Sequence, residues 1–276
     1  MEKILVATDL SANSVSAIQY AYRLCQLKGA KLVIVHVYYI SKPKSWRQHR
    51  YETYKNARKE FIIAKLNKFI SKIFSNTVDP IINIKIDIQM HQNTVNTILK
   101  SAIKYKCKYI CIGTHGSGKQ KNLLGPTASK LLAKSPKPII CIPNTYNKKT
   151  IDSICYSSDL LNYQKEIKKI IEFVNPMDIE FKLLHITDAP SSILKTKIIE
   201  TRLLKRTGFM VKMKYAQKKV TNTLLEDIDI SVKKMKPAMV IFFINRSKNY
   251  SNSIFTPAQA KQLSFLKKLP VLIYKK

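Results

Sequence analysis

The chain contains the same order of apolar segments twice. Three segments of the first half recur in the second half: 4–10 as 154–160, 33–37 as 181–186, and 137–143 as 269–274. The first two pairs have nearly the same offset. The first pair reads ILVATDL and ICYSSDL, so the Asp-Leu ending is kept. Such an internal repeat predicts two units that fold alike. We expect domains over 1–145 and 150–276, with a polar boundary at 144–150.

Short runs rich in Ile and Val alternate with helical patterns through the first half. This alternation is typical of βαβ units, in which helices cover parallel strands on both faces. The expected strands of this half lie near 3–8, 31–38, 82–90, 108–113 and 138–142. The sequence therefore predicts an α/β protein with two tandem doubly wound, Rossmann-like domains of about five parallel strands each.

Apolar residues at helical spacing place four helices between these strands. The first begins after a cap at Ser11 or Asn13, and the second lies in a long basic stretch that becomes amphipathic at Ile62. The third covers about 95–105. The fourth starts at Pro126, because proline is favoured at the first helical position.

A glycine-rich loop follows the fourth expected strand. Four of the six glycines in the chain fall between Gly113 and Gly125, directly after the apolar run 109–112. Glycine collects where backbone turns with positive φ or lets a ligand approach the amides. A strand, such a loop and a helix in that order predict a phosphate cradle. The corresponding loop of the second half, 245–250, has no glycine, so we expect the cradle in the first half alone.

One interpretation of the loop is a Walker A motif, because Gly113 and Gly118 precede Lys119 at the required spacing. Gln120 stands where that motif needs a Ser or Thr hydroxyl for Mg²⁺, and the next helix is expected only at Pro126. These two differences weigh against a P-loop.

The other interpretation comes from a resemblance. A first strand that ends at Asp9, a second that ends in Val-His-Val at 35–37, Gly-Thr-His-Gly at 113–116 and Gly-Pro-Thr-Ala at 125–128 are together similar to the universal stress protein family. The resemblance covers both halves. It implies that the first domain is a universal stress protein domain with a nucleotide-binding glycine loop, and that the second is a degenerate domain without that loop.

The resemblance also implies how the two domains meet. The last strand of each, 139–142 and 271–274, is apolar and would otherwise leave an open edge. In the family such strands pair antiparallel, so we expect an intrachain pseudo-dimer, and a homo-oligomer stays open.

For the ligand, the resemblance implies an adenine nucleotide, ATP or AMP with or without Mg, across the carboxyl ends of the strands. Asp9 would face the nucleoside, the backbone of Val37 would meet adenine, and Gly113 would approach the ribose. Gly116 and the turn at 125–127 would hold the phosphates, which suits amides at a helix start. The expected cofactor-binding residues are Thr8, Asp9, Val37, Gly113, Thr114, Gly116, Ser117, Gly118, Gly125 and Thr127.

The sequence departs from the family signature at two points. Eight residues separate Gly116 from Gly125 where the signature has nine, and Pro126 replaces a Ser or Thr. Proline offers neither an amide nor a hydroxyl, whereas Thr127 offers a hydroxyl and Gly118 offers room to adjust the loop. Two alternatives follow: an intact site, or the same fold without nucleotide binding.

The net charge of +32 is typical of proteins that bind nucleic acid, so nucleic acid is one candidate partner. The excess is nearly all Lys and is spread along the whole chain, which favours a solvated basic surface over nucleic-acid binding. At 42–58, however, Trp46, Tyr51 and Tyr54 alternate with Lys and Arg. This segment is interpreted either as a stacking surface for nucleic acid or, in preference, as an exposed loop that enters an amphipathic helix.

We expect no catalytic residue and no metal ligand. The five Cys residues mostly lie in apolar runs, and strand geometry would place Cys107 and Cys111 on one face about 13 Å apart, too far to share an ion. His36 and His185 occupy equivalent strand ends, where packing or hydrogen bonding is the expected role.

No apolar run approaches the roughly 18 residues of a membrane helix, and the first residues show no signal-peptide pattern, so we expect a cytoplasmic protein without membrane contact. The expected function is a nucleotide-binding stress-response or regulatory protein with at most slow ATP hydrolysis. The alternatives are a structural member of the same fold that does not bind nucleotide and a basic nucleic-acid-associated protein.

Overall fold

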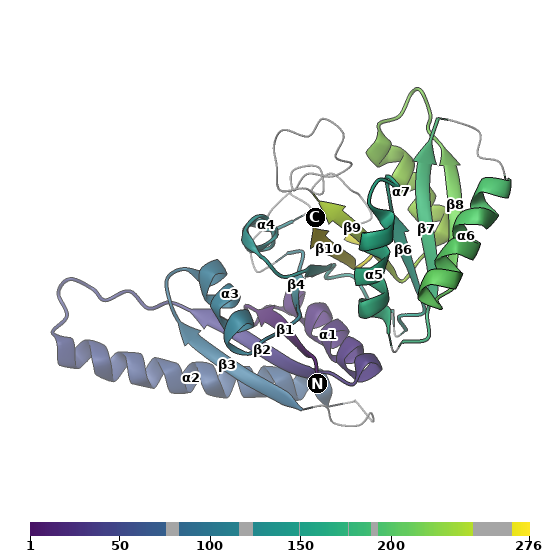
Figure 1. The fold of residues 1–276 in the computed structure, drawn as a ribbon. Coiled ribbons are helices and arrows are strands. Elements are labelled where there is room, and N and C mark those ends of the chain that lie inside the picture. The colour runs from purple at the N-terminus through teal and green to yellow at the C-terminus, as the bar shows by residue number, and fades with distance from the viewer. Residues whose placement is uncertain (76–82, 116–123, 149, 176, 189–192, 245–266) are drawn as a thin grey trace.

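A computed structural model describes residues 1–75, 83–115, 124–148, 150–175, 177–188, 193–244 and 267–276. Its strands form one ten-stranded sheet in the order β3-β2-β1-β4-β5-β10-β9-β6-β7-β8 (Figure 1). Within each half all strand pairs are parallel, and helices alternate with strands along the chain. The predicted α/β, doubly wound fold class is confirmed.

The five predicted strands of the first half are found to within two residues at each end. The elements of this half are β1 (Lys3–Thr8), a short 3₁₀ helix (Ala12–Ser14), α1 (Val15–Lys28), β2 (Lys31–Tyr38), α2 (Gln48–Phe74), β3 (Ile84–Met90), α3 (Thr94–Lys104), β4 (Tyr109–Gly113), α4 (Pro126–Lys134) and β5 (Ile139–Ile142).

The second half keeps the same spatial order of strands. Its elements are β6 (Ser153–Ser157), α5 (Tyr163–Val174), β7 (Glu180–Thr187), α6 (Ile193–Thr207), β8 (Val211–Gln217), α7 (Leu224–Met235), β9 (Met239–Ile244) and β10 (Val271–Lys275). The loop after β9, where the sequence has no glycine, lies outside the described residues.

The sheet lies between two apolar cores, one on each face. Alternate residues of β1 point to opposite faces. Ile4 and Val6 belong to the core that contains the apolar side chains of α1 and α5, and Leu5 and Ala7 belong to the core that contains those of α3 and α4. Each core runs across both halves of the chain. A strand buried on both faces needs a continuous apolar run, and this is why these segments were recognisable in the sequence.

The two halves are joined edge to edge. β10 pairs antiparallel with β5, with Ile273 opposite Ile139 and Val271 opposite Cys141. Each of these apolar strands therefore covers the edge that the other would leave open.

The start of α1 differs from the prediction. The expected side-chain cap by Ser11 or Asn13 is wrong, because the 3₁₀ turn delays the helix and Ser14 becomes its N-cap residue. The Ser14 hydroxyl donates instead to the Ser11 carbonyl oxygen, at 2.8 Å. The hydroxyl groups of Ser11 and Ser14 thus form hydrogen bonds within the turn after β1 and do not cap the helix.

The cysteines also correct one expectation. All five are buried free thiols, and burial raises the pKa of Cys107 to about 11 and of Cys25 to about 12. Cys107 and Cys111 do not share a face: Cys107 precedes β4 and packs in the core with α3, whereas Cys111 packs in the core with α1. β4 begins only at Tyr109, so strand alternation does not extend back to Cys107.

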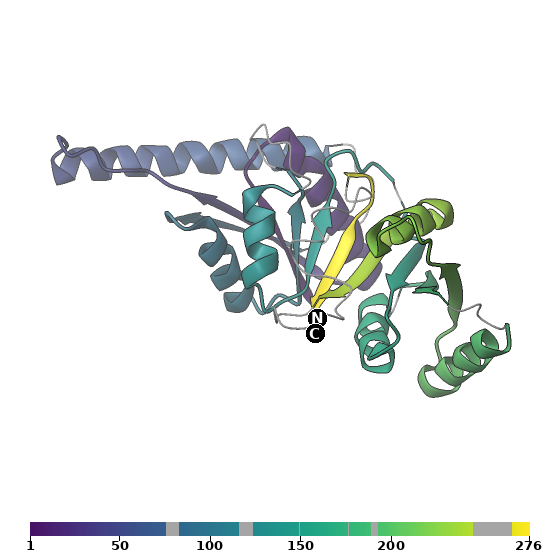
Figure 2. The same cartoon turned by 90° about the horizontal axis from the view of Figure 1, so that it is seen from above.

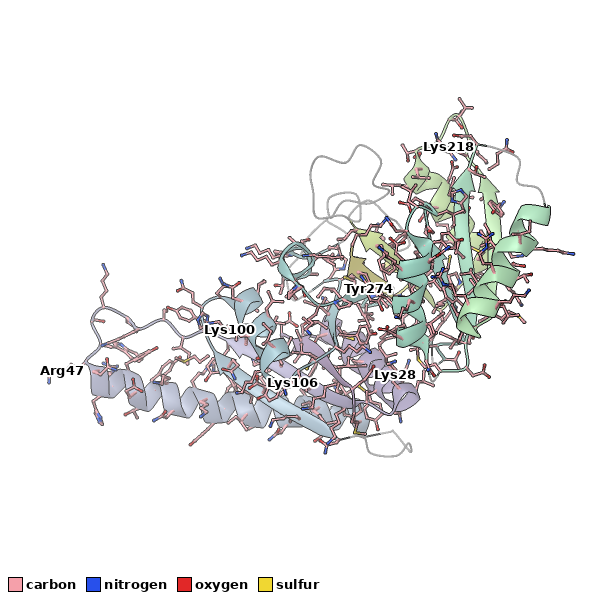
Figure 3. All side chains as sticks on the ribbon, in the orientation of Figure 1. Lys28, Arg47, Lys100, Lys106, Lys218 and Tyr274 are labelled. Atoms are coloured by element: carbon pink, nitrogen blue, oxygen red, sulfur yellow. The ribbon has the colours of Figure 1, made fainter. Side chains whose placement is uncertain are left out.

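Lys28 ties the C-terminus of α1 to the other half. Its ammonium donates to the carbonyl oxygens of Phe173 at 2.5 Å and Asn175 at 3.2 Å, where α5 ends, and lies 3.4 Å from Glu2. Lys28 is labelled in Figure 3. A cation at a helix C-terminus is favoured by the helix dipole. Burial is the largest influence on this side chain and lowers the pKa of Lys28.

Replacing Lys28 by Met tests this contact between the halves. The change leaves buried carbonyl oxygens of α5 without their donor, which costs about 1–3 kcal/mol of unfolding free energy. Urea unfolding followed by circular dichroism measures the loss. Lys100→Met, on the exposed face of α3, is the matched control and should change stability by less than about 0.5 kcal/mol. Equal stability of the two variants would show that Lys28 does not stabilise the junction.

Candidate functional site

A pocket of about 320 Å³ opens at the carboxyl ends of β1, β2 and β4. The chain leaves β1 toward β2 on one side, while β4 lies on the other, so this is the point where strand order reverses. Ligands of open α/β sheets bind at such a switch point. The pocket is lined by Ala7, Thr8, Asp9, Ser14, Val35, Val37, Thr94, Ile98, Ile112, Gly113, Thr114, His115, Gly125, Pro126, Thr127 and Ala128.

The turn after β1 fixes the polar wall of the pocket. The Thr8 hydroxyl accepts from the Leu10 amide at 3.0 Å and pairs with the Ser14 hydroxyl at 2.8 Å. One oxygen of the Asp9 carboxylate accepts from both the amide and the hydroxyl of Ser11, at 3.1 and 2.6 Å. Leu10 adopts a φ of 61°, which reverses the chain directly after Asp9. The Asp9 carboxylate is therefore held in one orientation on the pocket wall.

Close backbone packing surrounds the end of β4. A Cβ atom on Gly113 would lie 3.2 Å from the His115 carbonyl oxygen and 3.4 Å from that of Asn13, so only glycine fits comfortably. The Thr114 amide donates to the Ile142 carbonyl oxygen at 2.9 Å, and the Gly125 amide donates to the Thr114 carbonyl oxygen at 2.7 Å. The second bond joins the two ends of the glycine loop, and the first ties the chain after β4 to the end of β5.

The N-terminus of α4 forms the opposite wall. Pro126 is the first helical residue, as predicted, and Gly125 is the N-cap residue. Because Pro126 has no amide and the Gly125 amide is already bonded, the first-turn amides of Thr127 and Ala128 are the ones left to face a ligand. The helix dipole adds partial positive charge at the same place. The wall therefore suits an anionic group.

Seven of the ten residues expected from the sequence lie together on this pocket: Thr8, Asp9, Val37, Gly113, Thr114, Gly125 and Thr127. The other three, Gly116, Ser117 and Gly118, lie outside the described residues.

Several lining residues were missed by sequence reasoning. Val35 and Ile98 are apolar, and Thr94 is the first residue of α3. Two signals could have found them: Val35 is two residues before Val37 on the same face of β2, and α3 begins at the carboxyl end of β3.

The histidines at the strand ends brace the backbone. His36 Nδ1 lies 2.9 Å from the Thr8 carbonyl oxygen, and His185 Nδ1 lies 2.9 Å from the Ser158 carbonyl oxygen. The two halves thus repeat the same bond between their first two strands, in line with the hydrogen-bonding role expected for these side chains. His115 Nδ1 lies 3.1 Å from the Thr114 hydroxyl, inside the pocket.

In the second half, the counterpart of Asp9 serves a different network. Asp159 accepts from the Leu161 amide at 3.0 Å, as Asp9 does from Ser11, but its other oxygen lies 3.1 Å from the ammonium of Lys276. The same ammonium lies 3.1 Å from the buried Glu166 carboxylate. Tyr156 donates to Glu166 and accepts from the Ser158 hydroxyl at 2.9 Å. The chain's own cation therefore neutralises this acidic position.

Two further findings concern metals and membranes. Within the described ranges, no three His, Cys, Asp or Glu side chains are grouped closely enough to ligate a metal ion. The helices of those ranges include none with the length and apolar character that crossing a bilayer demands.

Comparison with known proteins agrees with this architecture. The sequence model of the universal stress protein family matches residues 1–143, which is just over half of the chain. No curated protein matches the chain at the sequence level.

Some solved structures match this chain over nearly its whole length, and others match about half of it. A universal stress protein from Archaeoglobus fulgidus is 14% identical and aligns with a TM-score of 0.68 over 99% of this chain and 98% of that one. A functionally unknown protein from Pseudomonas aeruginosa is also 14% identical, with a TM-score of 0.61 over 100% of this chain and 92% of its own. A universal stress protein from Archaeoglobus fulgidus in complex with dAMP matches 51% of this chain and 97% of its own, at 17% identity and a TM-score of 0.34.

The family match covers the half that contains the pocket, and the shared fold extends over both halves. The chain belongs to the universal stress protein family.

Proposed function

We propose that the pocket of the first half binds an adenine nucleotide, ATP or AMP, and that the protein is a cytoplasmic stress-response or regulatory protein. The observation that carries this proposal is the meeting of Asp9, Gly113 and the N-terminus of α4 around one pocket at the switch point of the sheet. A carboxylate, a close backbone approach and a helix start are three different recognition elements.

Each wall of the pocket suits one part of the ligand. Val35, Val37 and Ile98 provide apolar surface for the base. The Asp9 carboxylate can accept from ribose hydroxyls, and the amides of Thr127 and Ala128 can donate to phosphate oxygens. The Thr127 hydroxyl stands one residue after the position where Pro126 replaces the hydroxyl of the family signature.

The two halves have different tasks in this proposal. The domain at 1–145 holds the nucleotide, and the domain at 150–276 is a scaffold that completes an intrachain pseudo-dimer. Antiparallel pairing of β5 with β10 supports the pseudo-dimer, and the ion pair of Asp159 with Lys276 supports the scaffold role.

The pocket is better suited to holding a nucleotide than to cleaving it. Hydrolysis requires a base or a metal-held water placed beside the terminal phosphate. Among the described residues, Asp9 is oriented by Ser11 and His115 is paired with Thr114. We therefore expect at most slow ATP hydrolysis.

Thr127→Glu should abolish nucleotide binding without loss of fold. A carboxylate at the second position of α4 repels phosphate, yet the helix dipole favours it by about 0.3–1 kcal/mol. We expect Mg-ATP and AMP, but not GTP, to raise the melting temperature of the unchanged protein, since a hundredfold excess over Kd stabilises a native state by about 2.7 kcal/mol. The variant should lose this shift and keep its ligand-free melting temperature.

Gln164→Glu is the matched control, because it adds the same charge at the second position of α5, outside the pocket. It should keep the full adenine-nucleotide shift. Nucleotide stabilisation that survives in Thr127→Glu would place the ligand elsewhere, and no stabilisation of the unchanged protein at millimolar ligand would favour the structural member without nucleotide binding.

A second prediction compares Asp9→Asn with Asp159→Asn. Asparagine keeps the oxygen that accepts from Ser11, so Asp9→Asn should weaken adenine-nucleotide binding severalfold at nearly unchanged stability. Asp159→Asn removes the charge that faces Lys276 and should cost about 1.5–3 kcal/mol of stability, without any change in nucleotide Kd. Isothermal titration calorimetry and urea unfolding measure the two effects. The opposite pattern would assign the ligand to the second half.

A further inference from the structure

The first part of α2 projects from the body of the protein. α2 has 27 residues, but its buried residues are only Ile62 and Leu66, so the 14 residues before Ile62 extend about 21 Å past the packed part of the helix. Figures 1 and 2 show this rod running beyond the sheet, and Arg47 marks its far end in Figure 3. We call residues 39–61, the loop before α2 with this part of the helix, the α2 arm.

The α2 arm has an ordered surface of its own. The Trp46 ring meets the Tyr54 ring edge-on at 5.2 Å between centroids, which folds the loop back onto the helix. The Tyr51 hydroxyl donates to the Ile40 carbonyl oxygen at 3.1 Å, and the Lys42 ammonium donates to the Gln48 side chain at 2.8 Å. The loop is thus fixed against the helix by several independent contacts.

Arginine and aromatic side chains alternate along one face of the α2 arm. Arg50, Tyr54, Arg58 and Phe61 are spaced by four, four and three residues, so they follow one another on the same side of the helix. The Arg50 guanidinium lies 4.7 Å from the centre of the Trp46 ring, and that of Arg58 lies 5.0 Å from the centre of the Phe61 ring. Tyr54 and Phe61 are 45% and 54% exposed. Guanidinium groups that lie over rings and exposed aromatic side chains are therefore presented together.

The α2 arm is also strongly basic. Residues 39–61 contain seven Lys or Arg and two Glu. One of those acids, Glu52, lies 2.5 Å from Lys55. Its charge is therefore paired with that lysine and not with Arg50 or Arg58. Seven basic and two acidic side chains leave the α2 arm a net charge of +5.

We propose that the α2 arm binds single-stranded nucleic acid, with phosphates on the guanidinium groups and bases stacked on the exposed rings. Stacking platforms set in a positive surface are the common means of binding single strands without sequence preference. An anionic membrane fits less well, because helices that lie on membranes gather their apolar residues on one face, whereas here the aromatic residues are interleaved with arginine. The site lies apart from the nucleotide pocket and does not depend on it.

Trp46 makes the test specific. It is the one tryptophan in the sequence and lies under Arg50, so its fluorescence reports on the α2 arm alone. Titration of the full chain with an unlabelled oligothymidylate at about 50 mM salt should quench this emission with the same Kd that anisotropy of the labelled strand gives. The double variant Arg50→Gln/Arg58→Gln should weaken binding at least tenfold and reduce the slope of log Kobs against log salt by about 1.4.

The matched control is Arg202→Gln/Lys205→Gln, which removes two exposed charges from α6, a basic helix of the other half. It should keep most of the affinity, and circular dichroism should show both double variants folded. Three results would overturn the proposal: no quenching at low salt, an equal loss of affinity in both double variants, or arginine-dependent binding to phosphatidylserine vesicles without binding to the oligonucleotide.

Discussion

The antiparallel pair of β5 and β10 is the contact on which the whole sheet depends. Every residue of β5 is buried, as is most of β10, so neither strand could remain as the open edge of a separate domain. Pairing them merges two parallel sheets into one, and the apolar cores on both faces then continue from one half to the other. Lys28 closes the same junction from the helix layer by capping the end of α5.

The direction of that pair also places the equivalent turns of the two halves at opposite ends of the sheet. Because β5 and β10 run in opposite directions, the carboxyl ends of the two sets of parallel strands face opposite ends of the sheet. Asp9 and Asp159 occupy equivalent positions there, and their environments differ. Asp9 borders an open pocket, whereas Asp159 is paired with the ammonium of Lys276. One repeated turn thus borders an open pocket in one half and forms an internal ion pair in the other.

Sequence reasoning predicted the strands, which the local residue pattern determines, and the edge of the sheet where the glycine loop lies, which the direction of the strands determines. Runs such as 109–112 are apolar because the strands are buried on both faces, and the glycine loop after β4 had to lie at the carboxyl edge of the sheet. It did not recover contacts that depend on packing between distant segments. Cys107 and Cys111 lie in different cores because β4 begins only at Tyr109, and the pairing of Asp159 with Lys276 joins residues far apart in the chain.

We infer that one half of a duplicated fold keeps a nucleotide pocket while the other half pairs the equivalent acidic position with its own lysine. The most direct test is the stoichiometry of ATP binding to the full chain, measured by isothermal titration calorimetry. We predict one adenine nucleotide per chain. Two nucleotides per chain would contradict the assignment of Asp159 to an internal ion pair, and none would contradict the pocket of the first half as a nucleotide site.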